Sequence, residues 1–181
     1  MRLAGYLINS KEGLQGEHGF FYDYILAENG VFITAKSPLL EATVCVSEGI
    51  IRGLLPLEEK VSLLKGKIPR NLYNLALDVC YSDCYHERYL AVIWNDGYHL
   101  KNPVQTIGEA KVEYEPVPDA VMDIHSHGTM GAFNSGTDNA DEQGLRLYMV
   151  VGKLNTLIPD VRIRAGAYGY WYPLQEEEVF G

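Results

Sequence analysis

Apolar and polar residues alternate in short runs through the first 66 residues, with the period of two that is typical of β-strands. Turn-forming residues separate the runs, and Glu28-Asn29-Gly30 predicts a hairpin turn between two of them. We predict strands at 3–8, 20–27, 31–35 and 43–46, then a mixed stretch at 50–64 with a strand and a turn of helix. Residues 1–66 are therefore expected to form a β-rich N-terminal annex. Its simplest role is an accessory β layer, with substrate binding and oligomerisation as alternatives.

The pattern changes at residue 67 and predicts a second part that contains both helices and strands. Apolar positions recur every three or four residues between 68 and 84, which predicts an amphipathic helix with Pro69 in its first turn. The run Glu87–Trp94 is rich in β-forming residues, and Asn95-Asp96-Gly97 after it predicts a hairpin turn. Further strands are expected at 108–115, 121–127, 148–151 and 161–172, and a helix at 138–147. Residues 67–181 are thus predicted to be an α+β (mixed α/β) domain that packs against the annex.

Two runs near the C-terminus have less specific patterns. Ala167–Tyr172 is predicted to be the closing strand of the sheet, with Gly169 allowing close packing, although its aromatic residues could also form a docking face. The acidic run Gln175–Glu178 predicts a solvated tail.

Composition limits the classes of function without naming one. The chain has 181 residues, 47% hydrophobic and 22% charged, which are ordinary values for a globular domain. Its net charge of −9 argues against nucleic-acid binding and allows a basic protein or peptide partner without naming one. No apolar run approaches a membrane span, and the polar start predicts no signal peptide. Three cysteines, an odd number, fit a reducing cytoplasm.

The residues that predict chemistry lie between 121 and 141. His125 and His127 are two positions apart, so a strand directs both imidazoles to the same face of a sheet. Three glycines follow and allow the chain to fold back, which would bring Asp138 towards that face. Two imidazoles and one carboxylate, with a fourth position for water, are the ligands of a catalytic zinc. A strand with two solvated histidines followed by a loop would show the same spacing.

This spacing resembles the signature of the JAMM (MPN-plus) zinc metallopeptidases, a family that includes deubiquitinating isopeptidases. The matching pattern is His125-Ser-His127, seven residues, Ser135, two residues and Asp138, and the resemblance covers roughly residues 68–172. It implies one Zn²⁺ per chain bound by the two histidines and the aspartate, with the serine stabilising the tetrahedral intermediate. It also implies a curved mixed sheet flanked by helices, similar to cytidine deaminases. The family usually has proline where this chain has Gly128, a change expected to loosen the loop but to remove no ligand.

The family also has a glutamate as general base, near the start of a strand that follows a helix. Glu87 occupies that position, 38 residues before His125, which leaves room for two strands between them. Glu109 is the second choice, within an alternating strand, whereas Glu41 and Glu48 precede the helix and fit less well.

Several neighbouring residues have alternative roles. Asp123 could orient an imidazole or be a half-exposed strand residue, and Asp141 could replace Asp138 as a ligand. Ser135 could bond its own backbone in a loop. A rival zinc site could use Cys80, Cys84 and His86, although helix cysteines at this spacing are usually buried.

The resemblance implies a ubiquitin-like or sulfur-carrier protein, or a peptide, as substrate. Within the family, the N-terminal annex is similar to that of the bacterial PRTRC system protein A group, which would add a ThiF-like activating enzyme as a partner. Two other classes of function are considered. A catalytically silent scaffold would usually lack ligands that this chain retains. A RadC-like protein of DNA maintenance would carry a proline-rich loop and a helical N-terminal region.

Overall fold

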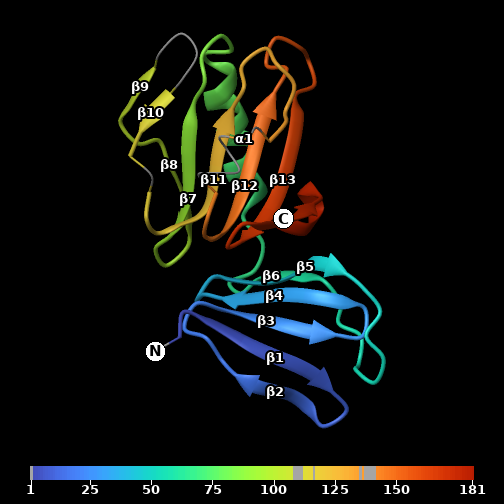
Figure 1. Cartoon of the computed structure of the whole chain (residues 1–181). Coiled ribbons are helices and arrows are strands. Elements are labelled where there is room, and N and C mark those ends of the chain that lie inside the picture. Colours follow the sequence, from blue (N-terminus) through green and yellow to red (C-terminus); the bar gives the residue numbers. More distant parts are fainter. Residues whose placement is uncertain (1, 108–111, 116, 135, 137–141) are drawn as a thin grey trace. The chain divides into compact units, whose positions relative to one another are not determined.

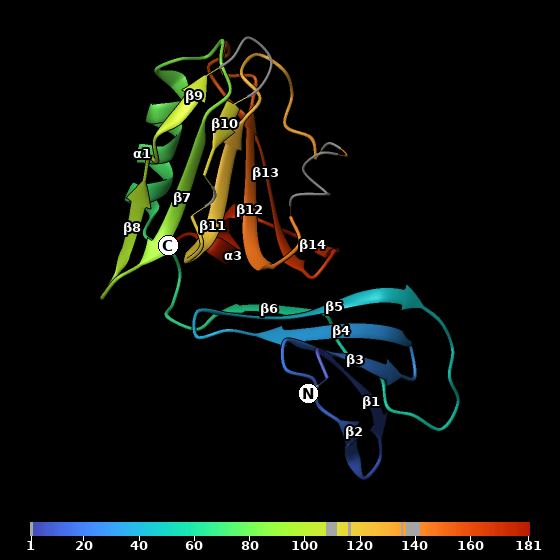
Figure 2. The ribbon, with the colours of Figure 1, turned by 60° about the vertical axis from the view of Figure 1, so that its left-hand side comes forward.

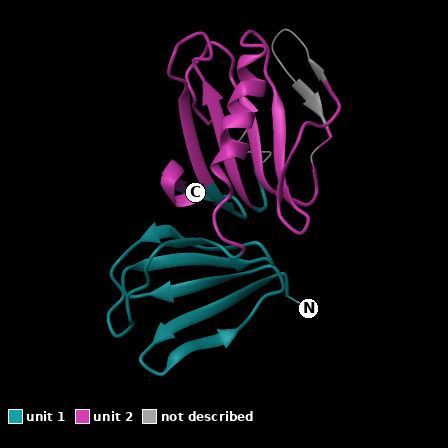
Figure 3. Ribbon diagram, turned by 180° about the vertical axis from the view of Figure 1, so that it is seen from behind, with its two compact units in different colours: residues 1–64, 142–145, 165–172 teal, residues 65–141, 146–164, 173–181 magenta. Residues whose placement is uncertain are grey.

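The computed structural model describes residues 2–107, 112–115, 117–134, 136 and 142–181. The chain forms two compact units (Figure 3). The first contains Met1–Leu64, Glu142–Leu145 and Ala165–Tyr172, and the second contains Lys65–Asp141, Arg146–Arg164 and Pro173–Gly181.

The first unit is built on a six-stranded sheet with the strand order β2-β1-β3-β4-β5-β6 (Figure 1). Its strands are β1 (Ala4–Ser10), β2 (Gly13–Glu17), β3 (Tyr22–Ala27), β4 (Gly30–Lys36), β5 (Leu40–Glu48) and β6 (Lys60–Leu63). β1 and β3 pair in parallel, and the other neighbours pair antiparallel. The predicted hairpin turn is confirmed, because β3 and β4 meet at Ala27 and Gly30, and Gly30 has φ +146°. A side chain at Gly30 would meet the Ser47 carbonyl at 2.3 Å.

Both faces of this sheet bury apolar side chains, whereas an alternation of apolar and polar residues predicts one buried face. One face carries the cluster Leu7, Ile25, Ala27 and Phe32, on which Leu57 packs. The opposite face carries the cluster Ile33, Ala42, Val44 and Ala167. β2 was not predicted, because all five of its residues are exposed and its sequence lacks apolar alternation. The helical turn predicted within 50–64 is wrong: the stretch contains only β6.

The run 167–172 is a hairpin turn and part of a strand rather than one closing strand. β13 (Asp160–Ala167) ends there and β14 (Tyr170–Leu174) begins, with Tyr168 at φ +50° and Gly169 at φ +93° in the turn. Within the first unit, Tyr168 lies with its ring centroid 4.5 Å from that of Tyr22. Gly169 therefore serves a turn and not close packing, and the aromatic run packs within its own unit.

The second unit is built on a mixed sheet with the order β14-β13-β12-β11-β7-β8. Its further strands are β7 (Tyr89–Trp94), β8 (Tyr98–Lys101), β11 (Ala120–Ser126) and β12 (Leu145–Gly152), and β9 (Gln105–Ile107) and β10 (Val112–Tyr114) form a separate two-stranded sheet. Asn95-Asp96-Gly97 makes the predicted hairpin turn, in which Asn95 N–H donates to the Gly97 carbonyl and Asp96 has φ +53°. The helix predicted up to 147 is wrong at its end, because Leu145 already starts β12.

One helix, α1 (Arg70–Tyr81), lies against this sheet (Figure 2). It is shorter than the predicted 68–84, and Pro69 is its N-cap residue rather than part of its first turn. Its buried residues are Tyr73, Ala76 and Cys80, the inward positions of the 3.6-residue period. The Cys80 thiol bonds the side chain of Ser126 on β11, which ties the helix to the central strand. Mixed sheets and few helices thus give the α+β class.

The acidic C-terminal run is not a solvated tail. It forms the short helix α3 (Glu176–Val179), with a capping box between Gln175 and Glu178. Phe180 is 2% exposed and pairs with Ile68 in a β-bridge. The Arg70 guanidinium lies over the Phe180 ring, 5.7 Å from the ring centroid. A buried aromatic residue therefore fixes this end of the chain beside the start of α1.

We predict that Phe180→Ala lowers the free energy of unfolding by about 3–5 kcal/mol, because it leaves a cavity beside Ile68 and Tyr73. Urea unfolding followed by circular dichroism measures this change. Leu157→Ala is the control, since Leu157 is fully exposed, and a change within about 0.5 kcal/mol is expected there. Equal stabilities of the two variants would show that the C-terminus does not contribute to the core.

Candidate metal centre

The central strand β11 brings the two predicted histidines together. β11 lies between β7, its antiparallel partner, and β12, its parallel partner, and His125 pairs with Tyr89 on one side and Val150 on the other. His127 follows directly after the strand. The two imidazole centroids are 5.0 Å apart, so both rings lie on the same face of the sheet, as the i, i+2 spacing predicts.

The burial and spacing of these rings fit a pair of metal ligands. His127 is only 6% exposed, and its Nδ1 is buried and has no hydrogen-bond partner among the described residues. The Nε2 of His125 is also buried. Two imidazoles bound to one tetrahedral zinc through bonds of about 2.0–2.1 Å have ring centroids about 5 Å apart. The observed separation therefore suits a shared zinc ion without rearrangement of the strand.

Phe133 closes one side of this pair. Its ring meets the His127 imidazole edge to face, with centroids 4.6 Å apart. An aromatic ring in that place restricts the rotation of the imidazole, which helps to hold it in one orientation for a ligand.

The strand register places Glu87 beside the histidines. Tyr89 pairs with His125, and two more residues in the same antiparallel register set Glu87 opposite His127. Hydrogen bonds continue this pairing, because Ser126 N–H donates to the Arg88 carbonyl and Arg88 N–H donates to the Ser126 hydroxyl. Residues directly opposite each other share a face of the sheet. A continued register would thus set Glu87 on the side of the imidazole pair, although Glu87 precedes β7 by two residues and does not open the strand.

A polar network holds the segment that carries Glu87. The Asp83 carboxylate bonds His86 Nδ1 at 2.8 and 2.9 Å and accepts a hydrogen bond from Arg88 Nη2 at 3.3 Å. The bond to His86 is the main reason why the pKa of Asp83 lies below its ordinary value. Both flanks of Glu87 are thus attached to one carboxylate.

Gly128 is required by the backbone at the turn that follows His127. Its φ is +57°, which the fixed ring of proline forbids, and a side chain would meet the Cys84 carbonyl at 2.9 Å. Hydrogen bonds fix the chain on both sides: His127 N–H donates to the Val151 carbonyl, and Leu154 N–H donates to the Gly128 carbonyl. In this chain, glycine at the usual proline position belongs to a firmly attached turn.

Asp123 lies on the face of the histidines, as predicted, but it is a partner of Arg146. Its Oδ2 accepts from Arg146 Nη1 at 2.6 Å, and its Oδ1 accepts from the Tyr89 hydroxyl at 2.7 Å. Burial raises the pKa of the carboxyl, with the guanidinium opposing that rise. The described partners of the Asp123 carboxylate are thus Arg146 and Tyr89, and the ion pair with Arg146 is mostly buried.

Arg146, Tyr89 and Phe133 are the site-adjacent residues that sequence reasoning missed. Arg146 fell within a wrongly predicted helix, and its position next to Asp123 depends on the pairing of β11 with β12. Tyr89 could have been found from the register of β7, once that strand is placed beside β11. Phe133 gave no signal in the sequence.

The other predicted residues of the site are not placed. Ser135, Asp138, Asp141 and Glu109 lie outside the described residues. Across the described part of the chain, no group of three or more His, Cys, Asp or Glu side chains is arranged to hold a metal. Glu41 and Glu48, the weaker candidates for the base, lie in β5 of the first unit.

The cysteines of the rival zinc site do not share a helix. α1 ends at Tyr81, so only Cys80 lies in it, buried against the sheet, while Cys84 follows in the next turn. Burial raises the pKa of the Cys80 thiol to about 11, which disfavours the thiolate that zinc requires. His86 is engaged with Asp83. Cys45, Cys80 and Cys84 are all free thiols.

Fold and site together define an α+β domain in which one half-buried and one buried histidine lie side by side at the end of the central strand. The model of a protein family described as prokaryotic homologs of the JAB domain matches residues 60–164, which is more than half of the chain. The chain therefore belongs to this family, and the resemblance to JAMM/MPN proteins is confirmed at that level. No curated protein matches the chain. No helix among the described residues is long and apolar enough to cross a membrane.

We predict that Gly128→Ala destabilises the protein by about 1–2 kcal/mol from the left-handed backbone alone, and by more because the new methyl meets the Cys84 carbonyl. Thermal unfolding of the purified variant measures this. Gly49→Ala is the matched control, because Gly49 has open space around it and no positive φ. A wild-type melting temperature for Gly128→Ala would contradict this description of the turn.

We predict that Arg146→Met costs about 3–5 kcal/mol at neutral pH, because it leaves the Asp123 carboxylate buried without its cation. Without the guanidinium, the pKa of this carboxyl rises further above its ordinary value, so the cost shrinks as the pH falls through that raised pKa towards about 4, the pKa of the unfolded chain. Replacing both residues, in Asp123→Leu with Arg146→Met, should return the stability to within about 1 kcal/mol of wild type. Additive losses in the double variant, measured by chemical unfolding, would contradict the ion pair.

Proposed function

We propose that this protein is a zinc-dependent peptidase or isopeptidase of the JAMM type. The observation that carries the proposal is the pair His125 and His127, at the separation that suits one zinc, and a continued strand register would add Glu87 opposite His127. His125, His127 and Asp138 would bind one Zn²⁺ per chain. When bound, zinc would lower the pKa of its water towards about 7 and polarise the carbonyl to be attacked.

The other catalytic roles would belong to side chains of the protein. Glu87 would act as general base and then pass the proton to the leaving amine. The Ser135 hydroxyl would donate a hydrogen bond to the oxyanion, a contribution of about 3–4 kcal/mol in related cases. Asp83 would keep the Glu87 segment in place through His86 and Arg88. The half-buried position of Glu87 suits a base that must meet its substrate out of bulk water.

The substrate class follows from the family and is part of the proposal. We expect a peptide or isopeptide bond at the C-terminus of a ubiquitin-like or sulfur-carrier protein, cleaved in the cytoplasm. Assignment to the PRTRC system protein A group, with a ThiF-like activating enzyme as partner, is a further expectation. We also expect a domain boundary at residue 66 and a curved sheet flanked by helices, similar to the sheet of cytidine deaminases.

The two alternatives have less support. A silent scaffold would not need two imidazoles paired at the separation of zinc ligands. A RadC-like role in DNA maintenance fits poorly with a β-sheet N-terminal unit and a net charge of −9, which opposes binding to phosphates.

We predict that the purified protein contains about one zinc per chain and that Asp138→Ala loses most of it, because two imidazoles alone hold zinc weakly. Elemental mass spectrometry of tag-free protein measures the content. Cys84→Ala is the control and should retain zinc. Loss of zinc from Cys84→Ala but not from Asp138→Ala would move the metal to the cysteines. No zinc in the wild type, even after reconstitution, would favour the scaffold.

We predict that Glu87→Gln retains zinc but lowers kcat by about 10²–10⁴-fold, because the amide cannot accept a proton. The assay is cleavage of a panel of fusions to ubiquitin-like proteins. Glu109→Gln is the matched control and should keep its activity. An active Glu87→Gln beside an inactive Glu109→Gln would reassign the base.

A further inference from the structure

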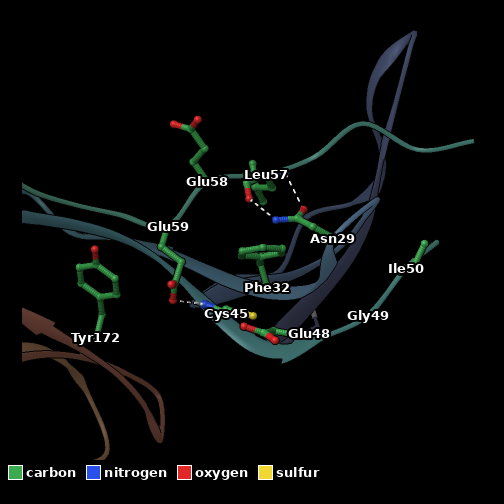
Figure 4. A pocket seen from close by; sticks show the side chains of 10 residues that line it. All are labelled: Asn29, Phe32, Cys45, Glu48, Gly49, Ile50, Leu57, Glu58, Glu59 and Tyr172. Atoms are coloured by element: carbon green, nitrogen blue, oxygen red, sulfur yellow. Dashed lines mark hydrogen bonds between the residues drawn. The ribbon is translucent and has the colours of Figure 1, made fainter. Parts of the chain in front are cut away.

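The first unit contains a hollow of its own, unrelated to the residues of the metal centre. It has a volume of about 830 Å³ and lies between the β4–β5 part of the sheet and the segment 49–59 (Figure 4). This volume is in the range of binding sites for ligands and peptide side chains. Leu57 is half-buried and supplies apolar surface above Phe32, which is itself only 2% exposed, and Ile50, which is 90% exposed, adds a further apolar side chain at the rim.

The wall made by segment 49–59 is attached to the sheet by specific hydrogen bonds. The Asn29 side chain donates from Nδ2 to the Leu57 carbonyl and accepts at Oδ1 from the Leu57 N–H, both at 2.9 Å. Glu59 Oε1 accepts from the Cys45 N–H of β5 at 2.7 Å. Leu57 in turn packs against the buried cluster that contains Phe32. The hollow is thus preformed, which lowers the cost of binding.

The charge of the hollow is one-sided. Glu48, Glu58 and Glu59 line it, and no lysine or arginine does. None of the three carboxylates forms an ion pair with another described residue. Burial raises the pKa of the Cys45 thiol, and the negative charges of Glu59 and Glu48 raise it further. Both carboxylates therefore act on the same side chain of the hollow. Three carboxylates without an ion-pair partner, next to apolar side chains, favour a ligand that carries a cationic group on an apolar stem.

We propose that this hollow docks an extended basic segment of a partner protein. Lysine and arginine combine an aliphatic stem, which would lie on Leu57 and Ile50, with a charged head for the carboxylates. A second copy of this chain fits less well, since each copy carries a net charge of −9 and like charges repel. The inference concerns binding only and goes beyond the proposed hydrolysis, so either can fail alone.

The test is fluorescence anisotropy of the full chain with a labelled nonapeptide in which lysine alternates with leucine and serine. Saturable binding is expected, weakening as the salt concentration rises from about 0.05 to 0.5 M. Replacing all three carboxylates, in Glu48→Gln, Glu58→Gln and Glu59→Gln, should weaken binding about tenfold, the combined effect of three exposed pairs. Ile50→Ser removes apolar surface without changing the charge and should weaken binding about threefold.

The matched control removes three exposed carboxylates elsewhere, in Glu12→Gln, Glu115→Gln and Glu177→Gln, and reaches the same net charge. It should bind the peptide as tightly as the wild type does. Equal weakening in both triple variants would reduce the effect to general attraction by an acidic protein and overturn the proposal. So would binding of an otherwise identical peptide with glutamate in place of lysine, or the absence of any binding at the lower salt concentration.

Discussion

The hydrogen-bonded register of β11 between β7 and β12 is the constraint on which the site depends. This register sets His125 opposite Tyr89, and its continuation sets His127 opposite Glu87. A slip of one residue would turn every side chain of β11 to the other face and move both imidazoles into the core beneath α1. The side chain of Ser126 opposes such a slip, because it binds both the Arg88 N–H and the Cys80 thiol on that other face.

Apart from the imidazoles, two polar pairs beside this strand help to explain its fixed geometry. Asp123 and Arg146 are mostly buried, so each would be costly without the other, and both are held by the same pairing of β11 with β12. At Tyr89, the first residue of β7, the Gln105 side chain takes the place of a backbone partner from β8. Its carboxamide accepts a hydrogen bond from the Tyr89 N–H and donates one to the Tyr89 carbonyl. The register would set Pro103, which has no N–H, at that point. The carboxamide therefore supports the residue that pairs with His125.

Local patterns predicted much of this architecture, whereas long-range pairings did not. Period-two alternation predicted β1, β3 and β4, and the spacing of His125 and His127 predicted their common face, because both depend on neighbouring residues only. β2 lacks any buried face and gave no signal. The end of the chain appeared polar in sequence, since the burial of Phe180 depends on distant Ile68. The Asp123–Arg146 pair likewise requires the strand register, which no local pattern contains.

The central claim is that two imidazoles and a carboxylate, without cysteine, form a one-zinc site. X-ray absorption at the zinc edge of the reconstituted protein tests it most directly, because sulfur and nitrogen or oxygen ligands differ in bond length. The account predicts a first shell of nitrogen and oxygen only, at about 2.0–2.1 Å, with the multiple scattering of two imidazoles. A sulfur shell at about 2.3 Å, or the signal of a single imidazole, would contradict it.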